Sequence, residues 1–164
     1  MRVLFVCTGN LCRSPLAQAM LDAEAARLQL SRYLETASAG THARDGATCP
    51  ALQQEIALAH GLDLSAHRAR RLTAQDFTDF DVLVALDLGH LDHLNFMRPP
   101  AARAVQMLLL SGVDEAGTIE VPDPYGGSAR AYARAAELIK MGIGHLLTRL
   151  LPAQAREEVS ARGR

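Results

Sequence analysis

Short apolar runs alternate along this chain with longer segments of helical periodicity. The first run, Val3-Leu4-Phe5-Val6, consists of β-branched and other large apolar side chains, which is typical of a strand buried on both faces. Similar runs predict strands over residues 34–38, 81–86 and 104–110, and apolar residues three and four positions apart predict helices over residues 15–30, 50–61, 87–96 and 128–151. Four strands that alternate with helices indicate a single-domain α/β fold, with a four-stranded parallel sheet flanked by helices.

The residues with suggestive chemistry lie where the predicted strands end. In a parallel α/β sheet, ligands bind outside the carboxyl ends of the strands. The first strand leads directly into the loop Cys7-Thr8-Gly9-Asn10-Leu11-Cys12-Arg13-Ser14, after which Ser14 as the cap and Pro15 as the first helical residue predict a helix start. The polar segment of residues 111–127, after the fourth predicted strand, contains Asp123. We therefore expect Cys7, Arg13 and Asp123 at one edge of the sheet.

The composition narrows the classes of protein to consider. With 164 residues, 49% hydrophobic and 21% charged, the chain has the size of one globular domain over residues 1–164, in which the charged residues 157–164 are expected to be a frayed tail. The 17 basic and 18 acidic residues give a net charge of −1, which argues against nucleic-acid binding. Three cysteines are too few for a disulfide scaffold, and no stretch approaches the roughly 18 apolar residues of a membrane span. We expect a cytoplasmic protein with reduced thiols and no membrane association.

The loop after the first strand has the features of an anion-binding site. Backbone N–H groups of a tight loop at a helix N-terminus converge on one point, and Arg13 adds a planar fork that matches two phosphate oxygens. Gly9 is expected to take a conformation that is costly for other residues, and Asn10 tolerates a positive φ. A thiol at the base of such a loop has a lowered pKa. The segment Cys7-x5-Arg13-Ser14 therefore predicts phosphoryl transfer to a thiolate.

Such a reaction also needs a group that protonates the leaving oxygen and then activates water. Asp123 lies between Pro122 and Pro124, which restrict the backbone on either side, and we predict that it fills both roles. Simpler explanations exist for each signal, because a cysteine after a strand is often a small buried apolar residue and Asp-Pro often only starts a turn. The cysteine spacing suits zinc poorly and the glycine-lysine signature of a nucleotide-binding loop is absent, so we expect no metal and no cofactor.

The chain resembles the low molecular weight protein tyrosine phosphatase family. The resemblance rests on residues 3–17 and on Asp123-Pro124-Tyr125, and it extends to Ser38-Ala39-Gly40-Thr41, Ser65-Ala66-His67-Arg68-Ala69-Arg70, Asp76-Phe77, Phe80-Asp81 and Leu86-Asp87. It implies a four-stranded parallel sheet and the hydrolysis of phosphotyrosine in proteins through a cysteinyl-phosphate intermediate, without a metal. Inorganic phosphate and other oxyanions are the implied small ligands.

The resemblance also assigns catalytic roles to individual residues. It implies that Cys7 is the nucleophile, that Arg13 clamps the phosphate, and that Asp123 is first the general acid and then the base. Ser14 corresponds to the hydroxyl that hydrogen-bonds the thiolate and eases its departure.

Further residues match the family's supporting and redox positions. Asn10, Ser38 and His67 correspond to a buried polar network that holds the loop in its strained shape. Cys12 corresponds to the neighbouring thiol that forms a disulfide with oxidised Cys7 and so protects it from irreversible oxidation.

The expected substrate rim departs from the family. Members usually have an aromatic residue in the loop after Ser38-Ala39-Gly40-Thr41, near the position that Arg44 occupies here. Tyr125 is present, but Gly126 follows it where some members have a second tyrosine. We expect a rim of Leu11, Arg44 and Tyr125, with one wall open or cationic.

Three other activities are alternatives. Arginine phosphatases resemble this chain closely but have threonine at the position of Leu11, where an apolar residue suits an aromatic ring. An arsenate reductase needs two further cysteines to relay a disulfide, and no cysteine follows Cys49. A phosphocysteine carrier or an oxyanion sensor has no need of both Arg13 and Asp123.

Overall fold

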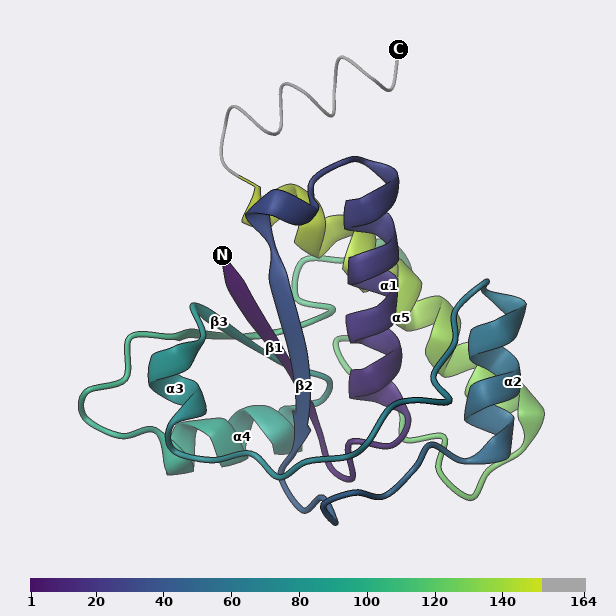
Figure 1. Ribbon diagram of the computed structural model, residues 1–164, viewed down its shortest axis with the longest axis horizontal. Helices are drawn as coiled ribbons and strands as arrows, with labels where there is room; N and C mark the ends of the chain where they lie inside the picture. The colour runs from purple at the N-terminus through teal and green to yellow at the C-terminus, as the bar shows by residue number, and fades with distance from the viewer. Residues whose placement is uncertain (152–164) are drawn as a thin grey trace.

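Four parallel strands form one sheet in the order β2-β1-β3-β4, with helices on both of its faces (Figure 1). The computed structural model describes residues 1–151. The strands are β1 (Arg2–Cys7), β2 (Glu35–Gly40), β3 (Val82–Ala85) and β4 (Val105–Leu108). The helices are α1 (Arg13–Arg27), α2 (Ala51–Ala59), α3 (Asp76–Asp79), α4 (Leu88–Met97) and α5 (Ala129–Leu150), with the 3-10 turns η1 (Ser31–Tyr33) and η2 (Asp114–Ala116). The predicted α/β fold is confirmed, whereas the predicted frayed tail at residues 157–164 lies outside the described residues.

The central position of β1 determines where the site forms. β1 pairs with β2 on one side and with β3 on the other, and its residues Val3 to Val6 are fully buried because both faces of the sheet are covered. The chain passes from β1 to β2 in one direction and then crosses to β3 on the opposite side. The strand order therefore reverses at the carboxyl end of β1, and open α/β sheets bind their ligands at such a reversal.

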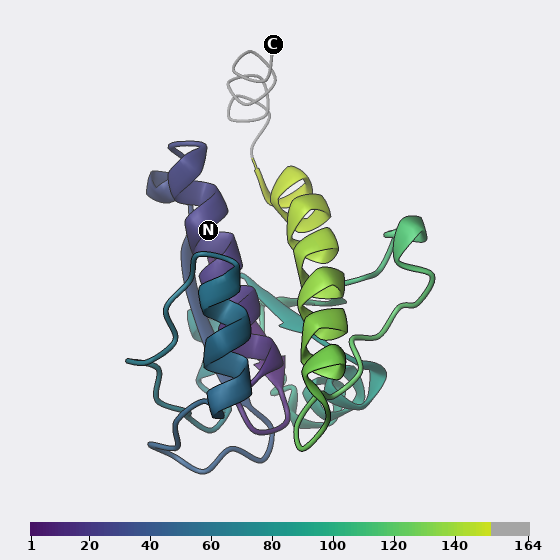
Figure 2. The same cartoon turned by 90° about the vertical axis from the view of Figure 1, so that its right-hand side faces the viewer.

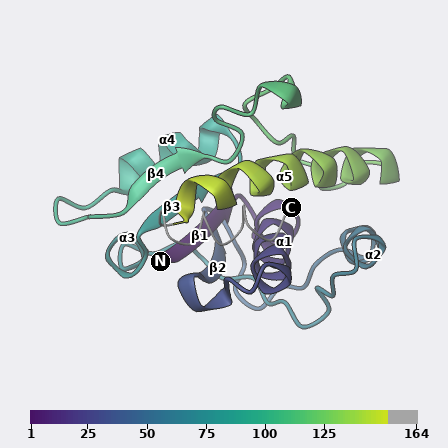
Figure 3. The same ribbon diagram turned by 90° about the horizontal axis from the view of Figure 1, so that it is seen from above.

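Separate hydrophobic clusters lie on the two faces of the sheet. Helices α1 and α5 lie side by side on one face, and α2 contacts α5 (Figure 2). Helices α3 and α4 cover the other face, where Phe77, Phe80 and Leu94 belong to the second cluster (Figure 3). This three-layer arrangement leaves the carboxyl ends of the strands free of covering helices, so the loops at that edge form the surface.

The longest helix has the predicted amphipathic pattern. Ala135, Leu138, Ile139, Leu146 and Leu150 of α5 are all buried against the sheet and α1. No helix within residues 1–151 combines the length and the apolar character that a membrane crossing requires.

The start of α1 differs from the prediction. The helix begins at Arg13, so Pro15 is its third residue rather than its first, and no side chain caps it. Ser14, predicted as the cap, lies inside the helix and directs its hydroxyl to the Sγ atom of Cys7, 3.0 Å away. Proline is tolerated at the third position because the N–H groups of a first turn have no acceptor within the helix. The free N–H groups at this end are consequently available to a ligand.

Candidate active site

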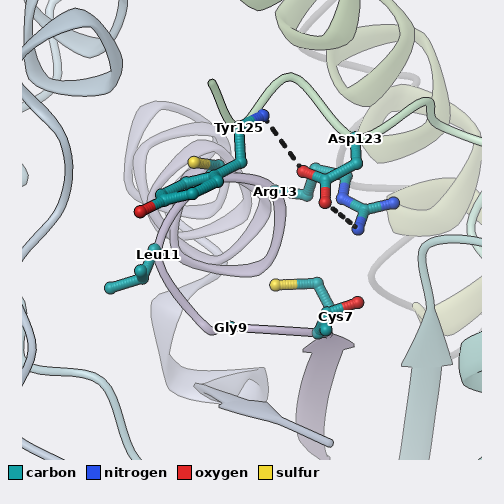
Figure 4. A pocket seen from close by; sticks show the side chains of 8 residues that line it. Cys7, Gly9, Leu11, Arg13, Asp123 and Tyr125 are labelled. Carbon is teal, nitrogen blue, oxygen red and sulfur yellow. Dashed lines mark hydrogen bonds and ion pairs between the residues drawn. The ribbon is translucent and has the colours of Figure 1, made fainter. Parts of the chain in front are cut away.

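A pocket of about 220 Å³ opens at the carboxyl end of β1 (Figure 4). Its floor is formed by Cys7 and by five residues of the phosphate-binding loop, by which we mean residues 8–14. Within the described part of the chain, no backbone N–H group of residues 8–14 donates a hydrogen bond to another protein group. Because buried backbone donors in proteins are nearly always paired, a run of unpaired N–H groups at a helix N-terminus indicates an anion site.

Asn10 holds the phosphate-binding loop in its curved conformation. Its φ of 54° lies in the left-handed region, which asparagine tolerates better than most residues. Its side chain compensates, because Nδ2 donates to the Ser14 hydroxyl at 2.9 Å and Oδ1 accepts from the backbone N–H of Arg70 at 2.9 Å. His67 Nε2 donates to the carbonyl oxygen of Asn10 at 2.7 Å. Burial lowers the pKa of His67, so the ring is neutral and carries its proton on Nε2, since a carbonyl can only accept.

Ser38, the third residue expected in this network, is placed differently from the expectation. It is buried in β2 opposite Phe5, and it makes no hydrogen bond to Asn10, Ser14 or His67 in the described structure. The carbonyl oxygen of its neighbour Ala39 accepts from the Ser14 hydroxyl instead, at 3.4 Å. β2 therefore contributes to the network through its backbone.

The glycine that the phosphate-binding loop requires lies outside it. Gly9 has no positive φ, and a Cβ there would meet only the side chain of Leu11, at 3.6 Å. The expectation that Gly9 adopts a conformation costly to other residues is therefore wrong, because Asn10 takes the left-handed conformation. The residue that packs directly against the loop backbone is Gly40, at the end of β2. A Cβ there would lie 2.5 Å from the Thr8 carbonyl oxygen and 2.9 Å from the Asn10 nitrogen. A side chain at residue 40 cannot coexist with the loop as it stands.

The three thiols have different surroundings. Cys7 lies at the base of the pocket with the Ser14 hydroxyl 3.0 Å from its Sγ atom. Because Asn10 donates to this hydroxyl, its one proton is left for one of two acceptors, the Cys7 sulfur at 3.0 Å or the Ala39 carbonyl oxygen at 3.4 Å, and the bond to sulfur stabilises a thiolate. Burial raises the pKa of Cys12 to about 12, and burial raises the pKa of Cys49 to about 11. Cys12 and Cys49 are therefore protonated at neutral pH, although Cys12 also lines the pocket.

Arg13 is fixed by groups from two distant segments. Its side chain is only 2% exposed, and its Nη1 atom donates to Oδ2 of Asp87 at 2.8 Å and to the carbonyl oxygen of Val121 at 2.9 Å. Its Nη2 atom lies 3.5 Å from Oδ2 of Asp123. These contacts orient the guanidinium plane and leave Nη2 and Nε available for a phosphate in the pocket.

Asp123 and Tyr125 form the side of the pocket opposite the loop (Figure 4). The Asp123 side chain is 52% exposed, and its Oδ1 atom accepts from the Tyr125 backbone N–H at 3.2 Å. Tyr125 lies beside Leu11, and both line the pocket. Arg44, expected at the rim, is exposed and does not belong to the pocket lining. The apolar part of the rim is thus placed as expected, and the cationic part is not.

Two residues that contact this site were not recognised from the sequence. Asp87 caps α4 by accepting from the His90 backbone N–H, and the same carboxylate binds Arg13. His90 Nε2 lies 2.8 Å from Oγ1 of Thr8 in the phosphate-binding loop. An aspartate before a helix already has an explanation as a cap, so nothing local indicates its second contact. Within residues 1–151, no three histidine, cysteine or acidic side chains are grouped so that they could hold a metal ion.

Comparison with known proteins gives consistent matches. The family described as low molecular weight phosphotyrosine protein phosphatase matches residues 2–159. A low molecular weight protein-tyrosine-phosphatase of Streptomyces coelicolor is 38% identical, over 98% of this chain and 97% of its own. A protein tyrosine phosphatase of Entamoeba histolytica, solved with Hepes in its active site, has a TM-score of 0.86 at 26% identity and covers 92% of this chain and 96% of its own. The arginine phosphatase of Drosophila has a TM-score of 0.85 at 31% identity and covers 93% and 99%.

Proposed function

The chain belongs to the low molecular weight protein tyrosine phosphatase family, and from this premise we propose which of its residues carry out the hydrolysis. The enzymes of this family hydrolyse phosphate monoesters through a cysteinyl-phosphate intermediate. We assign the nucleophile to Cys7, the phosphate clamp to Arg13, the general acid and base to Asp123, and the stabilisation of the thiolate to Ser14. The catalytic unit is a single domain formed by residues 1–164.

In the first step the phosphate dianion of the substrate occupies the pocket. The free N–H groups of the phosphate-binding loop and the guanidinium of Arg13 bind its oxygens. The Cys7 thiolate attacks phosphorus, the bond between phosphorus and the leaving oxygen breaks, and Asp123 donates its proton to that oxygen. The products are the free phenol and phosphocysteine.

In the second step water replaces the phenol. The Asp123 carboxylate accepts a proton from the water molecule. The oxygen of this water bonds to phosphorus as the sulfur–phosphorus bond breaks. Ser14 donates its hydroxyl proton toward the departing Cys7 thiolate, to which it lies 3.0 Å away. Inorganic phosphate leaves, and the enzyme returns to its initial protonation state.

The observation that carries this proposal is the run of unpaired N–H groups around a thiol, next to a buried and oriented arginine. A carrier or sensor would need the anion site but not a half-exposed carboxylate at its mouth. The active-site Hepes of the Entamoeba relative, whose sulfonate is an oxyanion, supports an oxyanion ligand for this pocket.

We propose phosphotyrosine in proteins as the substrate. A phenyl ring that enters the pocket can lie between Leu11 and Tyr125, and its length allows phosphorus to reach Cys7. Phosphoserine is too short for this. Phosphoarginine is long enough, but its guanidinium donors would be desolvated against Leu11 without an acceptor, at a cost of about 1–3 kcal/mol.

Arginine phosphatase activity is the second candidate, because the Drosophila arginine phosphatase has nearly the same fold. The decisive experiment is a comparison of kcat/KM for phosphotyrosine, phosphoserine and phosphoarginine with the wild type and Leu11→Thr. We expect a preference for phosphotyrosine of about ten- to a hundred-fold over phosphoarginine, narrowed by Leu11→Thr. Leu58→Thr, the same change on the exposed surface of α2, is the matched control and should leave kcat/KM for phosphotyrosine and for phosphoarginine unchanged. Equal turnover of both substrates by the wild type would contradict the tyrosine assignment.

The assignment of Cys7 has its own test. Cys7→Ser should bind inorganic phosphate yet show no turnover, because serine is not ionised at neutral pH. Turnover that is lost on chelation and restored by a divalent ion would contradict the mechanism. We place the reaction in the cytoplasm, where a reducing environment keeps the three free cysteines as thiols.

A further inference from the structure

One buried imidazole connects the phosphate-binding loop with the group that orients Arg13. His90 lies in the first turn of α4 and is 3% exposed. Its Nε2 atom is 2.8 Å from the Thr8 hydroxyl, and its Nδ1 atom is 3.0 Å from Oδ1 of Asp87. The other oxygen of the same carboxylate holds Arg13. The ring therefore lies between two parts of the site that are almost 80 residues apart in the sequence.

The surroundings of the ring determine its protonation and tautomer. Burial lowers the pKa of His90 to about 4. The carboxylates of Asp87 and Asp123 act to raise this pKa, and Arg13 and His93 act to lower it. The ring is therefore neutral at neutral pH and has one N–H. That proton belongs on Nδ1, because a bare Nδ1 lone pair would face a carboxylate oxygen at 3.0 Å; the contact lacks hydrogen-bond geometry and is therefore electrostatic. Nε2 must then accept from the Thr8 hydroxyl.

We propose that His90 is a positioning residue of this phosphatase: its ring holds Thr8, the first residue of the phosphate-binding loop, and its backbone N–H and ring contact Asp87, the carboxylate that orients Arg13. The proposal rests on the proposed function of the loop and of Arg13. It assigns His90 no contact with the substrate, since the residues that line the pocket do not include it. An error in its position would displace both the backbone donors and the guanidinium at once.

The pair of variants His90→Asn and His90→Gln separates the two contacts. The asparagine amide reaches the place of Nδ1 only, whereas the glutamine amide reaches the place of Nε2 and can again bind Thr8. Thr8→Val removes the hydroxyl from the other side and leaves His90 in the core, so it tests the same bond if His90→Asn does not fold. His93→Gln, one turn further along α4, is the matched control, because His93 contacts His42 and not the loop.

The measurements are kcat/KM for an aryl phosphate and the dissociation constant of inorganic phosphate, both well below the Tm of each variant. We expect His90→Asn and Thr8→Val each to lower kcat/KM about ten-fold and to raise the dissociation constant of phosphate about ten-fold, the cost of one buried unpaired polar group. The double variant should lose no more kcat/KM and no more phosphate affinity than the more impaired of the two single variants, because both changes break the same hydrogen bond. His90→Gln should recover to within about three-fold of the wild type, and His93→Gln should match the wild type.

Three results would overturn the proposal. These are phosphate affinity within two-fold of the wild type in every variant, losses by His90→Asn and Thr8→Val that multiply in the double variant, or a fall in Tm with unchanged phosphate affinity. Phosphate binding requires no turnover, so it also separates this proposal from the proposed function. If the wild type bound phosphate but hydrolysed no aryl phosphate, the catalytic assignment would fail while the affinity series still decided the role of His90.

Discussion

Replacing Gly40 with alanine would place a methyl group against the phosphate-binding loop from outside the pocket. The new Cβ would lie 2.5 Å from the carbonyl oxygen of Thr8, 2.8 Å from the Cβ of Ala43 and 2.9 Å from the backbone nitrogen of Asn10. Two of these three neighbours are backbone atoms of the loop, so no side-chain rotation can relieve the overlap. The loop itself must move.

The size of the movement follows from these distances. Ordinary contact with a Cβ begins near 3.4 Å, so the Thr8 carbonyl must shift by about 0.9 Å (3.4 minus 2.5). Overpacking of this kind costs about 1–3 kcal/mol of folding free energy. A displacement of about 1 Å at catalytic groups can cost roughly a hundred-fold in rate. We therefore expect Gly40→Ala to fold, to lose about 1–3 kcal/mol, and to lose about a hundred-fold in kcat/KM.

The assay compares three glycine-to-alanine variants in kinetics and urea unfolding. Gly144→Ala on the exposed side of α5 has no neighbour within 4 Å of its new Cβ and should gain up to about 1 kcal/mol with unchanged kcat/KM. Gly9→Ala, inside the loop, meets only a flexible leucine side chain and should lose far less activity than Gly40→Ala. A Gly40→Ala enzyme with kcat/KM within three-fold of the wild type would refute the claim that the loop depends on this close approach.

Three further outcomes are expected. Asp123→Asn should slow alkyl phosphates by about 10²–10⁴-fold and nitrophenyl phosphate much less, and equal losses in a leaving-group series would remove Asp123 from the acid role. Peroxide should inactivate the enzyme reversibly by oxidising Cys7 to the sulfenic acid, from which the Cys12 thiol displaces water; Cys12→Ser should stay active but resist rescue by thiols, and peptide mapping of a Cys7–Cys49 bond would contradict this pairing. Burial lowers the pKa of His90 to about 4, so between pH 6.5 and pH 4 the unfolded chain binds a proton at this residue that the folded protein does not. The free energy of unfolding should therefore fall by up to about 3 kcal/mol as the pH drops from 6.5 to 4. Urea unfolding of His90→Gln should show a weaker dependence on pH over this range.

The structural features that the sequence predicted correctly depend mostly on residues that are close together in the chain. The β1 run is recognisable because both of its faces are buried, and each of its side chains must therefore be apolar. Cys7, Arg13 and Ser14 lie within eight residues of sequence. Cys7 and Arg13 line the same pocket, and the Ser14 hydroxyl is in hydrogen-bond contact with Cys7. Asp123 is far away in sequence, but the prolines around it and its place at the carboxyl edge of the sheet predicted its position beside the pocket, where it lies.

The features that were missed depend on contacts between distant segments. Gly40 is required by the backbone of Thr8 and Asn10, which no local pattern around residue 40 records. Gly9 was preferred because it belongs to the motif, whereas the strained conformation falls on Asn10. His90 resembles any histidine in a helix until the fold places Thr8 beside it. Helix boundaries also shifted, since the Ser14 hydroxyl is used by Cys7 rather than by the helix start.

The hydrogen bonds of Asn10 have a consequence for the protein while it is still being synthesised. The loop is synthesised before the partners that hold it, because His67 and the N–H of Arg70 follow Asn10 by about 60 residues. The carbonyl of Val121 and the carboxylate of Asp123, which fix Arg13, come later still. A nascent chain that ends before these residues carries Cys7 as an ordinary peptide thiol. Its reactivity toward phosphate is acquired only after Asp123 has been synthesised and the loop has folded against its partners, so a chain that stops before Asp123 is not expected to act on phosphoproteins.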